Sequence, residues 1–384
     1  MKYILLLFCS NLIFCQKIST KNVIENEINI KNFFSEESSI HGGYQTNSLY
    51  IDSDNFFFCK EENKNTNIYL FYNKKEIKVT DFKNIDIYKD VNHFGLTLIL
   101  NNKLKKLFFA NNNTIYVVDF SQIEKMKAEC IFEVPKKYTL WAPLHITNEG
   151  DFLSFTLSIG KISFLARLNI LSEELLLKKS PFVGTEKPTA NHVQICPWDS
   201  NIIMFAHEGS WVQDRVWKWN IEKDTLFNVW QSNKYVEVGH EFFDKMGQDE
   251  NDIFLIQYGS PARKILSGLL QYKEELKEFV PLFYTNEFYV SHASNFKNLV
   301  VLDTYRKTFK KTNWILIYDI NADKLYRVCP VKVFNHPAHP HPYFNVDGSK
   351  IIFNHYNSEK NKIELREIEV NKILKEKNII RTQK

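Results

Sequence analysis

The sequence predicts an all-β protein that forms a seven-bladed β-propeller. Two observations lead to this fold class: aromatic residues make up 15% of the chain while glycine is sparse, and one pattern of residues recurs along the chain. The pattern is a polar turn, an apolar strand, a short gap and a second strand ending in a charged residue. It is clearest in residues 344–370. Since aromatic and β-branched residues favour strands, the composition is typical of a large β protein with a substantial core.

Looser copies of this pattern precede the clearest one. They begin near Tyr50, His93, His145, His192, His240 and His292. The step is about fifty residues, the length of a four-stranded propeller blade with a long loop, and the full count is seven. We see no Pro/Gly/Ser-rich linker, so we expect one domain over residues 16–384. A pair of two-sheet sandwiches is the alternative fold.

The chain begins with a segment that resembles a secretory signal peptide, residues 1–15. Lys2 is its only charge, and the apolar runs that follow are too short to span a bilayer. Cleavage after Cys15 would leave Gln16 first; lipid attachment at Cys15 and a short buried strand are the alternatives. We expect a periplasmic or secreted protein that is not inserted in a membrane once the signal is removed.

The segment between this signal and the first copy is expected to close the ring. Residues 23–30 alternate in polarity and could pair with the last blade, which would remove two exposed edges. The residues after Val370 are basic and lack a second apolar face, so we expect a peripheral tail or short helix.

Cysteine spacing and charge exclude several classes of protein. The four cysteines beyond Cys15 are widely spaced and form no CxxC pair, which indicates neither a zinc knuckle nor a disulfide scaffold. The net charge is +4 with 24% charged residues, too balanced to predict nucleic-acid binding.

The densest chemistry lies in residues 336–350, HPAHPHPYFNVDGSK, where three histidines fall within six residues. The prolines remove backbone donors and hold this piece extended, so alternation places His339 and His341 on the same side. Neutral imidazole is the commonest protein ligand for first-row divalent ions, which indicates a metal site. Asp347-Gly348 then predicts a tight hairpin turn. A proline-stiffened loop with surface histidines is the alternative.

Several histidines fall at equivalent places, at or just before the first strand of a copy: His192, His240, His292 and His341. The innermost strands of a propeller surround one central channel. We therefore expect these side chains to converge there, although chance placement would give the same pattern.

Five phrases of the second half, in this order, resemble oligogalacturonate lyases. They are NHVQICPWDSNIIMFAHEGSW (residues 191–211), DRVWKWN (214–220), GHEFF (239–243), SHASNF (291–296) and HPHPYFNVDG (339–348). The first half resembles the family only through the repeat. Members are seven-bladed propellers that cleave short oligomers of galacturonate by β-elimination, with a divalent metal, usually manganese, in the central channel. The resemblance implies a carbon–oxygen lyase that acts on an acidic oligosaccharide from pectin.

Matched position by position, the resemblance also implies roles for single residues. The metal ligands are His292, His339 and His341, the base is His240, and the essential arginine is Arg215. The alternatives are a structural ion pair for the arginine and a capped core histidine for the base.

The fourth ligand departs from the family, because His336 stands where the family has a glutamine. A fourth imidazole would shift the preference of the site from manganese toward zinc, nickel or copper.

This chemistry needs these residue types. The C5 proton of a uronate lies beside a carboxylate, and its removal builds further negative charge, which a metal acting as Lewis acid stabilises by several kcal/mol. Arg215 would add a two-donor contact to that charge. A histidine titrating near neutrality suits the base.

Other residues of the matching phrases have less defined roles. Four are assigned to substrate binding or to orienting other site residues: His192, Gln194, His207 and Glu208. Glu208 would orient a histidine. Four tryptophans either stack on sugars or, as we prefer, pack in the core: Trp198, Trp211, Trp217 and Trp219.

Three other functions stay open at this point. One is a non-catalytic periplasmic propeller for binding or scaffolding, which shares the DGSKIIF phrase and needs no metal. Another is the propeller of a serine peptidase, although the chain has no GxSxG elbow. A third is a lyase for a different uronate-containing oligosaccharide. Fold alone does not choose between them, and the histidine motifs favour the galacturonate lyase.

Overall fold

The computed structural model describes most of the chain between residues 23 and 373. The described residues are 23–25, 31–32, 39–41, 48–63, 65–83, 97–186, 188–209, 214–230, 236–244, 247, 251–259, 265–273, 275–304, 312–333 and 339–373. Outside them lie the expected signal peptide (residues 1–15), Trp211, His336 and the tail after residue 373.

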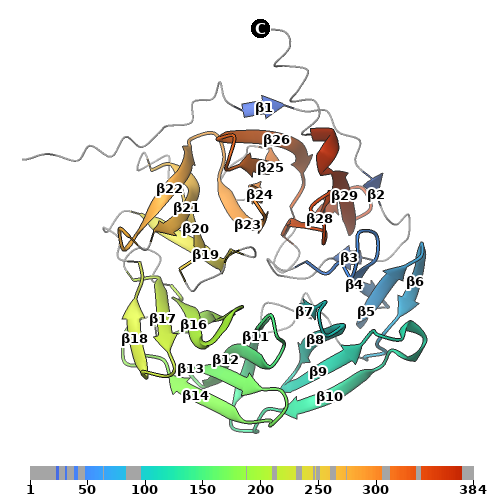
Figure 1. Ribbon diagram of the computed structural model, residues 1–384. Coiled ribbons are helices and arrows are strands. Elements are labelled where there is room, and N and C mark those ends of the chain that lie inside the picture. The colour runs from blue at the N-terminus through green and yellow to red at the C-terminus, as the bar shows by residue number, and fades with distance from the viewer. Residues whose placement is uncertain are drawn as a thin grey trace, which may run out of the picture.

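Seven sheets surround a central channel, and each is built mainly from antiparallel strands that are consecutive in the chain (Figure 1). The first blade contains β3 (Ser39–His41), β4 (Phe56–Glu62), β5 (Asn65–Tyr72) and β6 (Lys75–Lys78). The second contains β7 (Leu98–Asn101), β8 (Lys106–Asn111), β9 (Thr114–Asp119) and β10 (Ala128–Glu133). The third contains β11 (Thr139–Ile146), β12 (Phe152–Ile159), β13 (Ile162–Asn169) and β14 (Leu175–Lys179).

The remaining blades follow the same order. The fourth contains β15 (Ala190–Cys196), β16 (Asp199–His207), β17 (Val216–Asn220) and β18 (Thr225–Asn228). The fifth contains β19 (Glu237–Phe243), β20 (Ile253–Tyr258), β21 (Ser267–Lys273) and β22 (Glu278–Thr285). The sixth contains β23 (Val290–Phe296), β24 (Leu299–Thr304), β25 (Asn313–Asp319) and β26 (Lys324–Val331), and the last contains β27 (Tyr343–Phe344), β28 (Lys350–Asn357) and β29 (Lys362–Glu369). The predicted seven-bladed propeller is confirmed.

Helical structure is slight among the described residues. It consists of the short 3₁₀ helix η2 (Ile123–Lys125) and one turn at residues 370–373. No helix among the described residues has the length and apolar character needed to cross a membrane.

The segment before the first blade closes the ring, but the strand that pairs with the last blade is not the predicted one. β2 (Lys31–Asn32) pairs antiparallel with β29 and completes the last blade. β1 (Val23–Glu25), which lies in the alternating stretch expected to do this, instead pairs parallel with β26 of the sixth blade. Both outermost strands offer unpaired backbone groups, so the segment can add a strand to each of the two neighbouring edges.

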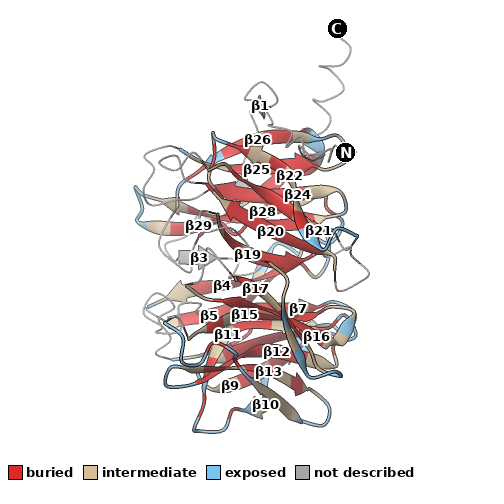
Figure 2. Ribbon diagram, turned by 90° about the vertical axis from the view of Figure 1, so that its left-hand side faces the viewer, coloured by how far each residue is buried: buried red, intermediate tan, exposed pale blue. Residues whose placement is uncertain are grey.

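Apolar packing also joins the first and last blades. Tyr343 of β27 belongs to the same buried cluster as Phe56 and Phe58 of β4. The hydroxyl of Tyr50 donates to Glu367 of β29 at 2.9 Å. Each fully buried aromatic or aliphatic side chain stabilises the fold by about 1.5–3 kcal/mol. Figure 2 shows these buried positions running along the strands, with exposed residues mainly in the turns.

Three of the four tryptophans of the matching phrases lie in the described residues, and they pack against buried clusters of the blades. Trp219 is buried among the strands of the fourth blade, and Trp217 lies edge-on to Phe182. Trp198 packs edge-on against Phe243. Cys59, Cys130, Cys196 and Cys329 form no disulfide with one another within the described residues.

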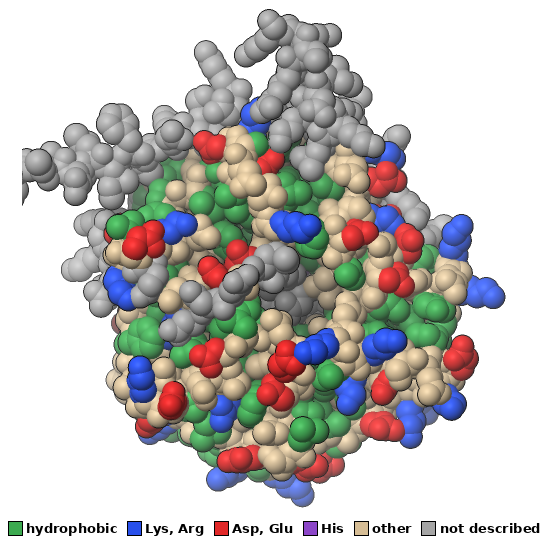
Figure 3. Space-filling view, in the orientation of Figure 1, with side chains coloured by type: hydrophobic (Ala, Val, Ile, Leu, Met, Phe, Trp, Pro, Cys, Tyr) green, Lys and Arg blue, Asp and Glu red, His purple; other side chains and the backbone are tan. Residues whose placement is uncertain are grey.

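Charges on the surface are mixed. In Figure 3, lysine and arginine side chains are interspersed with aspartate and glutamate over the face that is drawn.

The innermost strands of four successive blades each contain a bulge, and these bulges position site residues. The pairing register shifts between Trp141 and His145 in β11 and between Asn191 and Gln194 in β15. It shifts again between Gly239 and Phe242 in β19, and between Val290 and Ala293 in β23. Bulges leave extra residues outside the ladder and re-aim their side chains. The bulged residues include His192, His240 and His292.

Candidate metal and catalytic site

The backbone of the channel histidines is strained. His192, His240 and His341 have φ values of 51°, 50° and 40°, in the left-handed region. This conformation costs a non-glycine residue about 1–3 kcal/mol and persists where the surrounding structure enforces it, often at functional sites. Here the bulges enforce it at His192 and His240.

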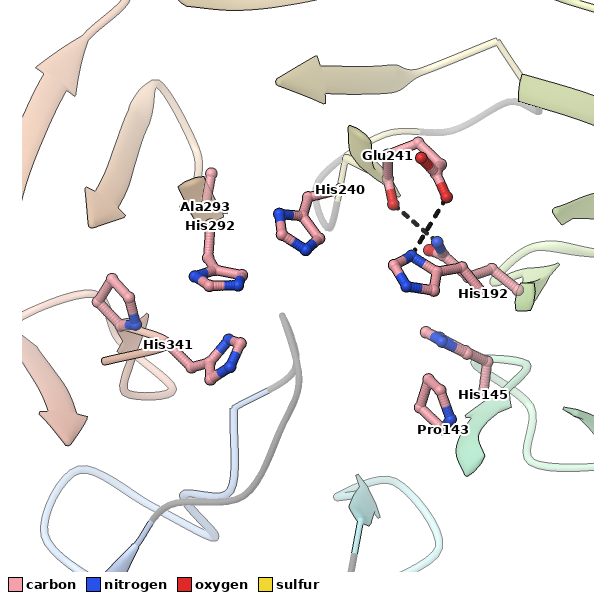
Figure 4. A pocket seen from close by; sticks show the side chains of 10 residues that line it. Pro143, His145, His192, His240, Glu241, His292, Ala293 and His341 are labelled. Carbon is pink, nitrogen blue, oxygen red and sulfur yellow. Dashed lines mark hydrogen bonds and ion pairs between the residues drawn. The ribbon is translucent and has the colours of Figure 1, made fainter. Parts of the chain in front are cut away.

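The side chains of His192, His240 and His341 line one cavity at the centre of the ring. It has a volume of about 50 Å³ and is lined by Pro143, His145, His192, Gln194, His240, Glu241, His292, Ala293, His341 and Pro342. Figure 4 shows His240, His292 and His341 along one side and His145, His192 and Glu241 along the other.

Three histidines form a compact cluster at this cavity. One ring nitrogen from each of His292, His339 and His341 lies within 4.8 Å of the other two. Their ring centroids lie 3.9 Å (His292–His341), 5.4 Å (His292–His339) and 5.8 Å (His339–His341) apart. The last two histidines share a side, as predicted, although His341 adopts a left-handed rather than an extended backbone. Three neutral imidazoles fit a first-row divalent cation.

Asp303 of β24 orients the central member of the cluster. Nδ1 of His292 lies 3.0 and 2.9 Å from the two Asp303 oxygens. The backbone N–H groups of His292 and His341 donate to the same carboxylate at 2.9 and 3.1 Å. Burial raises the pKa of Asp303 to about 6 although these N–H groups act against it. A carboxylate on one ring nitrogen fixes the tautomer and leaves the other nitrogen for a metal.

His240 has the hydrogen bonds expected of a base. Its Nδ1 lies 2.5 Å from the carbonyl of Ser291 and 2.9 Å from the hydroxyl of Tyr258. Because a carbonyl only accepts, Nδ1 carries the proton and Nε2 is the basic nitrogen. Its ring centroid lies 4.2 Å from that of His292. The expectation that this histidine titrates near neutrality is wrong, since burial, with His192 adding to it, lowers its pKa to about 4.

Arg215 lies in a buried ion-pair network that includes Glu241 of the cavity wall. It is 1% exposed. Its Nη1 donates to Glu208 at 3.1 Å and its Nε to Glu241 at 3.4 Å. Burial alone would lower the pKa of Arg215, but Glu241 and Glu208 raise it above its ordinary value. The adjacent Asp214 pairs with His207 instead.

Glu241 links this network to the cavity. Its Oε1 lies 3.3 Å from Nδ1 of His192, and its backbone carbonyl accepts from Nε2 of Gln194 at 2.7 Å. Burial acts to raise the pKa of Glu241, but Arg215 and His192 outweigh it and hold that pKa at about 2. Glu241 is therefore a buried anion beside two cavity histidines.

The structure gathers five of the predicted residues at the cavity and places others outside its lining. His192, Gln194, His240, His292 and His341 line the cavity. His207 instead stacks on Phe182 at 3.5 Å between ring centroids. Glu208 contacts Arg215 rather than a histidine.

Three site residues were not predicted from the sequence. Glu241 follows His240 directly, and an acid inside the apolar GHEFF phrase was the available signal. Asp303 is likewise a lone acid that ends the apolar run LVVLD. His145 marks the start of a repeat copy, and burial lowers its pKa to about 3, so it is neutral in the cavity wall.

Comparison with solved structures places this architecture among known propellers. An oligogalacturonate lyase in complex with manganese superposes with a TM-score of 0.73 at 17% identity, covering 89% of this chain and 93% of that one. An oligogalacturonate lyase from Vibrio parahaemolyticus superposes with a TM-score of 0.74 at 15% identity, covering 90% and 94%. A puromycin-hydrolyzing peptidase from Mycobacterium tuberculosis gives 0.54 at 9% identity, and 53% of that chain is covered.

No protein-family model and no curated protein sequence matches the chain. Fold and site together define a seven-bladed β-propeller with a histidine cluster in its channel. The resemblance seen in the sequence phrases extends to three dimensions, since the propeller is similar to those of the solved oligogalacturonate lyases over nearly its whole length.

Proposed function

We propose that this protein is a metal-dependent lyase that cleaves short oligomers of galacturonate by β-elimination. The observation that carries the proposal is the position of His240 beside the histidine cluster, with 4.2 Å between its ring centroid and that of His292. A base next to a site for a divalent cation is what proton removal beside a carboxylate requires. The likeness to oligogalacturonate lyases supports the choice of substrate class.

The residues that would hold the cation are His292, His339 and His341. When bound, a divalent ion supplies Lewis-acid polarisation of the uronate carboxylate. Manganese is the metal that the resemblance implies. Zinc, nickel or copper would be favoured if His336 adds a fourth imidazole.

His240 would remove the C5 proton at its Nε2. The C–H electron pair forms the C4–C5 double bond as the C4–O bond breaks. The departing oxygen keeps the electrons of that bond and takes up a proton, which balances the one that His240 later releases. The products are an unsaturated uronate and a shortened oligomer, and no water is consumed. Donation from Nδ1 to Ser291 orients the ring. The low pKa keeps His240 neutral at pH 7, so it is available to accept the proton.

Arg215 would act through its neighbours. The resemblance implies a contact with the substrate carboxylate, but its burial between Glu208 and Glu241 favours a positioning role. By holding Glu241, it would fix His192 at the cavity wall. We further propose, from residues 1–15, that the chain is exported and meets its substrate in the periplasm or outside the cell.

The test is an assay on the metal-loaded protein. Incubation with oligogalacturonate should raise ultraviolet absorbance as the unsaturated product forms, and His339→Ala and His341→Ala should abolish both metal binding and this rise. A rise in absorbance only with oligomers of another uronate would support lyase activity but with a different substrate. No rise with any divalent ion or uronate would overturn the proposal in favour of a non-catalytic binding or scaffold propeller.

A further inference from the structure

A second pocket opens beside the channel, between the third and fourth blades. It has a volume of about 350 Å³ and is lined by Trp141, Thr156, Ser158, Gly160, Lys161, Ser163, Pro188, Thr189, Ala190 and Asn191. That volume lies in the range of small-molecule sites, about 300–1,000 Å³. None of these side chains belongs to the histidine cluster or to the ion-pair network described above.

The pocket adjoins the catalytic cavity through shared strands. Trp141 precedes Pro143 by two residues in β11, and Asn191 directly precedes His192 in β15, while Pro143 and His192 line the cavity. The backbone N–H of Glu208 also donates to the carbonyl of Thr189 at 2.9 Å, which ties the pocket wall to the Arg215 network.

The chemistry of the lining suits an acidic sugar. The indole of Trp141 is held by a hydrogen bond from its Nε1 to the hydroxyl of Ser158 at 2.7 Å, and the side chain is partly exposed. An indole offers a flat apolar surface for the C–H face of a sugar ring. Ser158, Ser163 and Thr189 supply hydroxyl groups that can bond to sugar oxygens.

The charge of the pocket lining favours a uronate over a neutral sugar. Lys161 is exposed at the tip of the hairpin between β12 and β13, and no salt bridge to it is found within the described part of the chain. The lining contains no aspartate or glutamate. An ammonium group facing a wall without carboxylates attracts an anionic ligand.

We infer that this pocket is an accessory subsite that binds a further uronate unit of the substrate, with the ring on Trp141 and the carboxylate on Lys161. The inference rests on the proposed function, because it takes the catalytic cavity to hold the unit that reacts. It predicts that affinity rises with chain length once the oligomer reaches from the cavity into the pocket.

The test compares the galacturonate dimer with the tetramer. In Lys161→Gln, KM for the tetramer should rise about tenfold, the effect of losing one charge-assisted contact. In Trp141→Ala it should also rise, because the sugar ring loses its apolar surface. The kcat for the tetramer, both constants for the dimer, and the metal content should stay unchanged. Lys360→Gln is the matched control, since Lys360 lies in the equivalent hairpin of the last blade, between β28 and β29. If both variants have the wild-type KM for the tetramer, the subsite is refuted and the lyase proposal is unaffected.

A binding measurement separates the subsite from the chemistry. Calorimetric titration of the tetramer into metal-loaded His240→Ala protein, with and without Lys161→Gln, needs no turnover. If the wild type has no lyase activity but tetramer affinity still falls about tenfold with Lys161→Gln, the subsite stands without the lyase. Equal affinity with and without the substitution, or no binding of the tetramer, would refute it.

Discussion

The two carboxylate oxygens of Asp303 lie 3.0 and 2.9 Å from Nδ1 of His292. Asp303 is fully buried and also accepts the backbone N–H groups of His292 and His341, so one side chain positions two members of the histidine cluster. Such carboxylate–histidine pairs orient metal ligands from behind.

We expect Asp303→Asn to weaken metal binding by about 10–100-fold, because an amide cannot accept with both of its terminal atoms. Calorimetry with manganese and zinc measures this directly. Asp319→Asn is the control, since Asp319 is also buried in the sixth blade but accepts from Asn298 and Ala322. Equal metal affinity in Asp303→Asn and wild type would remove Asp303 from the account of the site.

The buried arginine provides a prediction about stability. Arg215→Met should lower the free energy of unfolding by about 3–5 kcal/mol, because Glu241 then stays buried without its cation. Urea unfolding measures the loss. Arg167→Met should cost less, since the Arg167 guanidinium donates to the carbonyl of Ser200 and lies nearer the surface. Arg215→Lys should rank between wild type and Met, because an ammonium keeps the charge but not the two-carboxylate geometry. If Arg215→Met costs no more than Arg167→Met, the network is not a stabilising one.

Two histidines with lowered pKa values predict how stability changes with pH. Burial lowers the pKa of His145 to about 3 and that of His355 to about 4, from an ordinary value of 6.5. Below pH 6.5 these histidines are protonated in the unfolded chain but stay neutral in the folded chain. Their contribution to stability is therefore fully present above pH 6.5 and is lost as pH drops toward 4 and then 3. The slope for His145 is at most about 1.4 kcal/mol per pH unit.

Urea unfolding of the metal-free protein between pH 7.5 and pH 4.5 would measure this slope. His145→Gln and His355→Gln should each flatten it, whatever they do to stability at pH 7.5. If the double variant loses stability with falling pH as steeply as the wild type, other groups cause the loss of stability at low pH.

Ring closure predicts an effect of truncation. A chain that begins at residue 42 lacks β1, β2 and β3, so the last blade loses its outermost strand and the first its innermost. Its thermal midpoint should fall by several degrees more than that of a chain beginning at residue 31, which lacks only β1. Matching midpoints for the two truncations would mean that β2 and β3 do not hold the ring.

The sequence was enough to predict features that repeat along the chain. It did not predict features that depend on contacts between strands distant in the sequence. Seven apolar strand patterns were enough to count the blades, because every blade buries the same kind of face. Most of the site histidines were found because they fall at one equivalent place in several copies, and His339 because it stands in the histidine-rich segment before the last hairpin. Asp303 and Glu241 were missed, since each becomes a site residue only through partners on other strands.

Backbone conformation was also beyond the sequence patterns. The left-handed φ values of His192 and His240 depend on bulges, which appear only when two strands are paired in register. β1 joined the sixth blade rather than the last for a related reason, because alternation indicates a strand but does not choose between two available edges. The pKa of His240 required its burial to be known.

The central claim is that His240 is a base beside a separate metal cluster, and two measurements on one sample test it. Metal content and turnover of oligogalacturonate should both be determined on His240→Ala, with His292→Ala in parallel. We predict that His240→Ala keeps its metal while kcat falls by about 10²–10⁴, the usual effect of losing one positioned base, and that His292→Ala loses its metal. Loss of metal together with turnover in His240→Ala would contradict the claim and place His240 among the ligands.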